Sequence, residues 1–207
     1  MIVPKMVKIR QLFTKDRLEN PAEKLAGKLG ESGLLNGAGA GARIAVTAGS
    51  RGIHGIAGIL RAITGELRRK GAQPFIVPAM GSHGGGAASG QVEMLESLGI
   101  TEKNVGAPIQ SSMETVVVGT TPAGVPVYMD KNAYESDGIV IVNRVKLHTA
   151  FHGPVESGLC KMVAVGLGKK RGAETMHRLG FDAMGGCIVK SASIACDKAN
   201  IICGVAI

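Results

Sequence analysis

Residues 138–177 read GIVIVNRVKLHTAFHGPVESGLCKMVAVGLGKKRGAETMH, and this stretch decides the expected fold. It opens with an apolar strand at 138–143, followed by a glycine-containing turn and two short helical runs. The ionisable residues that follow the strand include His148, His152, Lys161 and His177. An apolar strand that runs out into ionisable side chains is where open α/β sheets place their sites. The alternative is a basic loop and helix whose lysines and histidines are only solvated.

An earlier stretch has the order strand, glycine loop, helix. The strand RIAVT at 43–47 ends in a loop at 48–52 that contains Arg51. The following helix has an apolar stripe at Ile56, Leu60, Ile63 and Leu67, and it ends in cations and a glycine at 68–71. A fixed cation at such a loop can hold a phosphate or carboxylate. The alternative for Arg51 is a solvated surface arginine.

The next unit repeats this order. The strand QPFIVP at 73–78 leads into a loop at 79–86 and then a helix at about 87–98. His83 lies at the centre of the loop, where core packing does not explain a histidine, although solvent exposure does. The backbone N–H groups of Gly84, Gly85 and Gly86 are candidates for an anion site at the helix start.

The remaining segments complete an α/β pattern. Further elements are expected as a strand at 7–13, a helix starting at Pro21, a hairpin at 113–129, a helix at 185–199 and a strand at 201–207. Alternating strands and helices predict a layered, mostly parallel, Rossmann-like sheet with helices on both faces. The carboxyl ends of parallel strands share one edge, so Arg51, His83 and His148 are expected to converge there.

Length and composition limit the number of domains, the kind of binding partner and the cellular compartment that can be expected. The chain has 207 residues, which suits a single α/β domain, and its end within an apolar strand suggests a fragment that lacks a C-terminal domain. The net charge of +8 favours anionic partners, but aromatic residues make up only 3%, which argues against nucleic acid. Four cysteines without CxxC spacing indicate a reducing cytoplasm. No apolar run approaches a membrane span in length.

Several familiar motifs do not fit. The stretch at 166–170, GLGKK, lacks the first glycine and the Ser/Thr of a P-loop. The glycine loop at 81–86 does not give the dinucleotide fingerprint, and the chain has no G-x-S-x-G elbow. His148 and His152 have metal-ligand spacing for a helix, but a Gly-Pro pair follows at once.

Taken together, these segments resemble the nickel-pincer lactate racemase family over about residues 40–207, the N-terminal domain of that family. The matching segments are AMGSH at 79–83, KLHTAF at 146–151, SGLCK at 157–161, the step of 16 residues from Lys161 to His177, and AGSR at 48–51. Ala48 replaces an acidic residue of the family, and the segment between the second histidine and the lysine is longer than in the lactate enzymes. These departures indicate a divergent branch.

The resemblance implies roles for these residues. It implies that His83 and His148 are catalytic, that His177 binds nickel, and that Lys161 is joined covalently to the nickel complex of pyridinium-3,5-bisthiocarboxylic acid mononucleotide. Arg51 and the loop at 84–86 would hold the nucleotide phosphate. The expected activity is racemisation or epimerisation of a 2-hydroxy acid by hydride removal and return, with dedicated cofactor-making enzymes as partners. The alternative is a non-catalytic α/β domain that binds a phosphorylated small ligand.

The chemistry explains why such residues are needed. The hydrogen on the α carbon of a 2-hydroxy acid is too weakly acidic for a histidine to remove as a proton, whereas a hydride acceptor avoids this difficulty. Histidines can take the hydroxyl proton near neutral pH. Lys161 must be neutral to react, and burial beside Leu159, Met162 and Val163 is expected to lower its pKa. His152 is expected to be structural or a local hydrogen-bonding residue.

Overall fold

The computed structural model describes residues 6–12, 18–148, 152, 153 and 155–207. Its strands are β1 (Arg43–Ala48), β2 (Gln73–Pro78), β3 (Thr115–Thr120), β4 (Pro126–Asp130), β5 (Gly138–Asn143) and β6 (Ile201–Ala206). Its helices are α1 (Pro21–Glu31), α2 (Ile56–Arg69), α3 (Ala88–Ser97), α4 (Glu102–Val105), α5 (Lys131–Tyr134), α6 (Gly158–Lys161), α7 (Lys169–Arg178) and α8 (Gly180–Lys198), with a 3-10 turn η1 (Gly84–Gly86) and a π-helix η2 (Met162–Gly166). The strand and helix order predicted from the sequence between Pro21 and the last strand is confirmed.

The main sheet has four parallel strands in the order β2-β1-β5-β6. The chain moves from β1 outward to β2, and later returns to the other side of β1 to form β5. Adjacent parallel strands whose connections leave in opposite directions form a crevice at their carboxyl ends. The carboxyl edge of β1 and β5 is therefore the expected position for a site.

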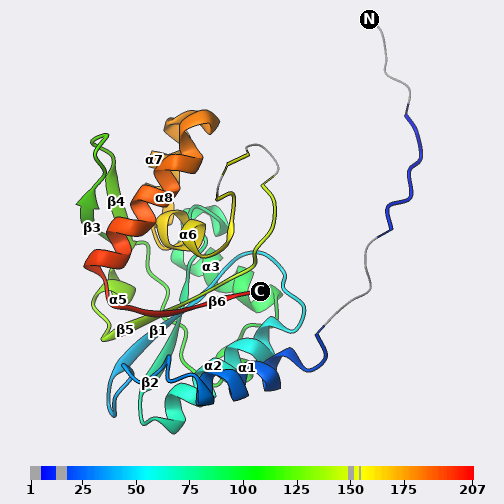
Figure 1. Cartoon of the computed structure of the whole chain (residues 1–207), viewed down its shortest axis with the longest axis vertical. Coiled ribbons are helices and arrows are strands. Elements are labelled where there is room, and N and C mark those ends of the chain that lie inside the picture. Colours follow the sequence, from blue (N-terminus) through cyan, green and yellow to red (C-terminus); the bar gives the residue numbers. More distant parts are fainter. Residues whose placement is uncertain (1–5, 13–17, 149–151, 154) are drawn as a thin grey trace, which may run out of the picture.

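Helices cover both faces of this sheet, as predicted. Figure 1 shows α1 and α2 on one face, and α6, α7 and α8 on the other. The side chains of β5 explain this sandwich because alternate residues point to opposite faces. Val140 and Val142 belong to the core that includes α2, whereas Ile139 and Ile141 belong to the core that includes η2 and α8. A strand buried on both faces reads as a continuous apolar run.

The predicted hairpin is also present. β3 and β4 pair antiparallel in a separate two-stranded sheet. It packs against α7 and α8 on the same face as η2. Val127 and Met129 bury their side chains in that core. The hairpin thereby brings the end of β4 to the start of α7.

The strand predicted at 7–13 is wrong over its described residues. Residues 7–12 have no regular secondary structure and, in the described part of the chain, pair with no strand. Val7, Ile9 and Leu12 are 77%, 82% and 81% exposed. Figure 1 shows this segment away from the sheet. An apolar run forms a strand only when a ladder partner is available, and Phe13 itself lies outside the described residues.

In the described parts of the chain, no helix has both the length and the apolar character that a membrane crossing requires.

Candidate functional site

Three loops at the carboxyl edge of the sheet hold predicted site residues. Arg51 follows β1, His83 follows β2 and His148 follows β5, and these strands are neighbours in the sheet. Residues more than 30 positions apart in the sequence therefore share one edge. The convergence expected from the strand pattern is present in the structure.

Electrostatics link these side chains more closely. The ring of His83 reaches solvent, yet partial burial lowers its pKa, and the positive charges of Arg51 and Lys161 lower it further. Burial also lowers the pKa of His148, followed by the charges of Lys161 and Lys146. Charges that change each other's proton affinity must lie close together. Lys161 is therefore common to the surroundings of both histidines.

Lys161 has the electrostatic environment expected from the sequence. Burial lowers its pKa, and the positive charges of Lys146 and Arg51 act in the same direction. Its side chain is half-buried at the end of α6. A lowered pKa gives the amine a larger neutral, nucleophilic fraction. The prediction of a depressed lysine pKa at this position is confirmed.

The backbone after Lys161 has an uncommon form. The chain continues directly into the π-helix η2, whose residues Met162, Val163 and Ala164 are buried. A π-helical turn widens the helix and occurs often at functional sites. A Cβ added at Gly166 would come within 2.7 Å of the Ala79 carbonyl oxygen. The absent side chain at Gly166 thus allows η2 to contact the loop that leads to the first histidine.

Polar contacts fix the start of α6. The Asn143 side-chain amide at the end of β5 donates to the Gly158 carbonyl oxygen at 2.8 Å. The Lys146 N–H donates to the Ser157 hydroxyl at 2.7 Å, and that hydroxyl donates back to the Lys146 carbonyl. The end of β5 is therefore connected directly to α6, the helix that ends at Lys161.

Glu156 organises the loop that carries the second histidine. One carboxylate oxygen accepts from the His148 N–H at 2.7 Å, and the other lies 3.1 Å from the His152 ring and accepts from the Gly153 N–H at 3.2 Å. The bond from His148 is the main cause that lowers the pKa of Glu156. His152 is thus a local hydrogen-bonding residue, as predicted, and it is not in a helix.

His177 lies in the last turn of α7. Its charge is among those that lower the pKa of His148, which places it near that histidine. Its exposed ring offers one imidazole ligand. Among the described residues, no three His, Cys, Asp or Glu side chains gather in a way that could hold a metal ion.

Gly84, Gly85 and Gly86 form the turn η1, and all three have positive φ angles near 65°. Packing alone explains Gly84, because an added Cβ would come within 2.6 Å of backbone atoms of Gly90 and Gln91. The Gly86 N–H donates to the His83 carbonyl at 3.3 Å. The turn lies beside the first histidine, and a role in anion binding remains a prediction.

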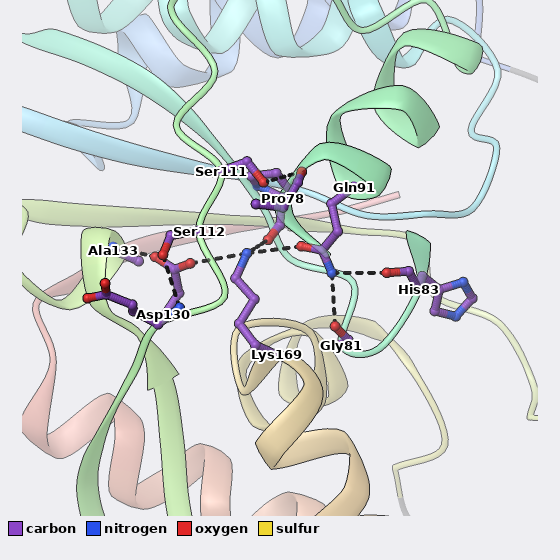
Figure 2. A network of polar contacts seen from close by, with 11 residues as sticks. Pro78, Gly81, His83, Gln91, Ser111, Ser112, Asp130, Ala133 and Lys169 are labelled. Carbon is purple, nitrogen blue, oxygen red and sulfur yellow. Dashed lines mark hydrogen bonds and ion pairs between the residues drawn. The ribbon is translucent and has the colours of Figure 1, made fainter. Parts of the chain in front are cut away.

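Sequence reasoning missed a buried polar cluster beside this site. Lys169, the first residue of the basic run at 169–171, is fully buried, whereas Lys170 and Arg171 are exposed. Its amino group lies 3.1 Å from a carboxylate oxygen of Asp130, which is also fully buried (Figure 2). A run of three cations is typical of a solvated surface. No pattern in the neighbouring sequence indicates that Lys169, unlike the two cations after it, is buried.

A surface pocket lies at the same edge of the sheet but holds none of the predicted site residues. Its lining includes His54 after β1, Arg144 after β5 and Ile207. The histidine and lysine cluster is thus separate from this hollow.

Comparison with solved structures supports the fold. A crystal structure of a protein from Thermotoga maritima superposes with a TM-score of 0.63 at 17% identity, over 87% of this chain and 49% of the other. The chain thus spans about half the length of that protein. A search of curated proteins finds no match. The model of the lactate racemase N-terminal domain matches residues 22–184, and the chain belongs to this family.

Proposed function

We propose that this domain is the cofactor-binding and catalytic part of a racemase or epimerase of a 2-hydroxy acid. The observation that carries the proposal is the gathering of His83, His148, Lys161 and His177 at one sheet edge of a lactate racemase N-terminal domain. Each has the type of side chain that its proposed role requires. The substrate identity depends on contacts that a second domain would add.

The residues present fit a nickel-pincer nucleotide. A half-buried amine with a lowered pKa at Lys161 suits covalent attachment. The positive charges of Arg51 and Lys146 beside it suit an anionic nucleotide. His177 offers an imidazole nitrogen, which is a suitable ligand for nickel. When bound, this cofactor supplies an acceptor for the hydrogen on the α carbon of the substrate.

The two histidines would accept and return the proton of the substrate hydroxyl group. The substrate hydroxyl must lose its proton as the α carbon is oxidised to a ketone. A neutral ring nitrogen of His83 would hold this proton for one enantiomer, and one of His148 for the other. The lowered pKa of each ring favours its neutral form at pH 7, and only the neutral form can accept a proton.

The histidine roles have a direct test in single-turnover reactions of the full-length, cofactor-loaded protein. The 2-keto acid is trapped chemically while each enantiomer of a panel of 2-hydroxy acids is supplied separately. We expect His83→Asn to lose oxidation of one enantiomer and His148→Asn to lose the other. His54→Asn, an exposed histidine outside the cluster, should retain both. Loss of the same enantiomer in both variants would contradict the two-base assignment.

A second candidate is a non-catalytic domain that binds a phosphorylated ligand. Under either proposal we expect the protein to be cytoplasmic. The positive charges gathered around Lys161 favour it. Lys161→Ala distinguishes the two proposals. It should abolish turnover and cofactor retention in an enzyme, whereas a non-catalytic domain should retain its fold and most of its ligand affinity.

A further inference from the structure

A buried cluster of three side chains joins elements that the sequence does not place together. The Lys169 amino group donates to the Pro78 carbonyl at 2.5 Å and to the Gln91 side-chain oxygen at 3.1 Å, and it pairs with Asp130 at 3.1 Å. The side chains of Lys169, Gln91 and Asp130 are all fully buried. We call these three residues the buried clamp. Figure 2 shows the amino group between its partners from β2, α3 and β4.

The buried clamp is costly to maintain. Lys169 has a φ of 53°, a left-handed conformation that favours glycine. Burial raises the pKa of Asp130 and lowers the pKa of Lys169, so the interior opposes both charges. A buried ion pair adds little stability compared with well-packed apolar side chains. A lysine at this position therefore has a role that glycine or an apolar residue would not supply.

The contacts of Gln91 show what the clamp holds. Its amide group donates to the Gly81 carbonyl at 2.9 Å and to the His83 carbonyl at 3.2 Å. Lys169 holds Pro78 at the start of the same loop. In Figure 2 the ring of His83 points away from the clamp while its carbonyl faces Gln91. The clamp thus fixes the backbone of the loop and leaves the imidazole free to face the site.

A second set of contacts joins this loop to the segment after the reactive lysine. The Gly81 N–H donates to the Gly166 carbonyl in η2 at 3.1 Å. The Asp130 N–H donates at 2.7 Å to the carbonyl of Leu167, two residues before Lys169. The clamp, the histidine loop and the end of η2 are therefore one connected unit.

We infer that the buried clamp of Lys169, Asp130 and Gln91 is a positioning device that sets the place of His83 relative to Lys161. The catalytic consequence rests on the proposed function, whereas the structural part concerns the loop alone.

Gln91→Glu tests this inference most sharply. A carboxylate can still accept from Lys169, but it cannot donate to the Gly81 and His83 carbonyls and would repel them. Gln73→Glu makes the same chemical change at an exposed position at the opposite end of β2. Gln91→Met removes the donors without adding charge, and it serves if the carboxylate prevents folding.

Two measurements on the full chain report on the loop without any cofactor. We expect amide hydrogen exchange at 83–87 to become about tenfold faster in Gln91→Glu or faster still. The NMR titration midpoint of His83 should rise towards its ordinary value, while that of His148 stays unchanged. Gln73→Glu should leave all three unaltered.

Turnover then separates the inference from the proposed function. A looser loop together with less keto acid trapped from one of the two hydroxy acid enantiomers supports both. A looser loop with normal turnover supports the clamp and overturns the catalytic role of His83. Unchanged exchange and an unchanged His83 titration in a folded Gln91 variant would overturn the clamp, whatever the activity.

Discussion

Lys169→Met at pH 7 should strongly destabilise the fold. The change leaves the Asp130 carboxylate, 0% exposed, in the interior without its counter-charge. Removal of one partner of a buried pair typically costs about 3–5 kcal/mol. For a domain of this size, each kcal/mol lowers Tm by about 2–4 °C, so we expect a fall of about 6–20 °C.

A double variant separates the charge from the packing. Asp130→Asn combined with Lys169→Met removes both charges, and such replacements are often nearly neutral for stability. We therefore expect the double variant to regain most of the lost free energy of unfolding. Lys170→Met, at the exposed neighbouring position, should change it by less than about 0.5 kcal/mol.

The loss in Lys169→Met should also depend on pH. Burial raises the pKa of Asp130 in the native chain, so the folded state tolerates the protonated carboxyl better than the ionised one. The penalty is therefore smallest below the unfolded pKa of about 3.9 and grows as the pH rises through that value. Urea unfolding at pH 4 and pH 7 measures this difference. A single variant within about 1 kcal/mol of the native chain at pH 7 would refute the reasoning, as would a double variant that is equally unstable.

Two further predictions concern the site. Gly166→Ala would place a Cβ within 2.7 Å of a carbonyl oxygen in the loop after β2, and it should cost about 1–3 kcal/mol in urea unfolding. At Gly186 an added Cβ would meet no atom within 4 Å apart from its chain neighbours and the backbone of its own helix, so Gly186→Ala should stabilise α8 by about 0.5–1 kcal/mol. Equal effects of the two substitutions on stability would contradict the packing argument. NMR titration of His83 and His148 should give midpoints below about 6.5, since burial and nearby cations disfavour the protonated rings. Lys161→Ala should raise both midpoints, and midpoints that stay fixed would show that the three side chains are not close.

Apart from the strand expected at 7–13, the strands of the parallel sheet and the residues on its carboxyl edge could be predicted from the sequence. The continuous apolar run of β5 indicates burial on both faces, and its alternate residues do belong to two separate cores. The glycine loops that follow β1 and β2 locate Arg51 and His83, because their position depends only on strand direction. Periodicity and turn chemistry are local properties, so they are readable from the sequence.

The missed features depend on contacts between distant residues. Lys169 and Asp130 are 39 positions apart in the sequence, and only the docking of the hairpin on α7 brings them together. At residues 7–12 the sequence instead predicted an element that is not present. Their apolar pattern suits a strand, but no partner strand is present in the described structure. Burial of a charge and availability of a ladder partner are both tertiary properties, and local patterns do not report them.

We propose above all that Lys161 carries a nickel-pincer nucleotide. The most direct measurement is the intact mass, peptide map and nickel content of the full-length protein co-produced with the cofactor-making enzymes. We predict an adduct on Lys161 and nickel in equimolar amount, with both lost in Lys161→Ala, only nickel lost in His177→Ala, and both retained in Lys170→Ala. A folded native protein with neither adduct nor nickel would contradict the account.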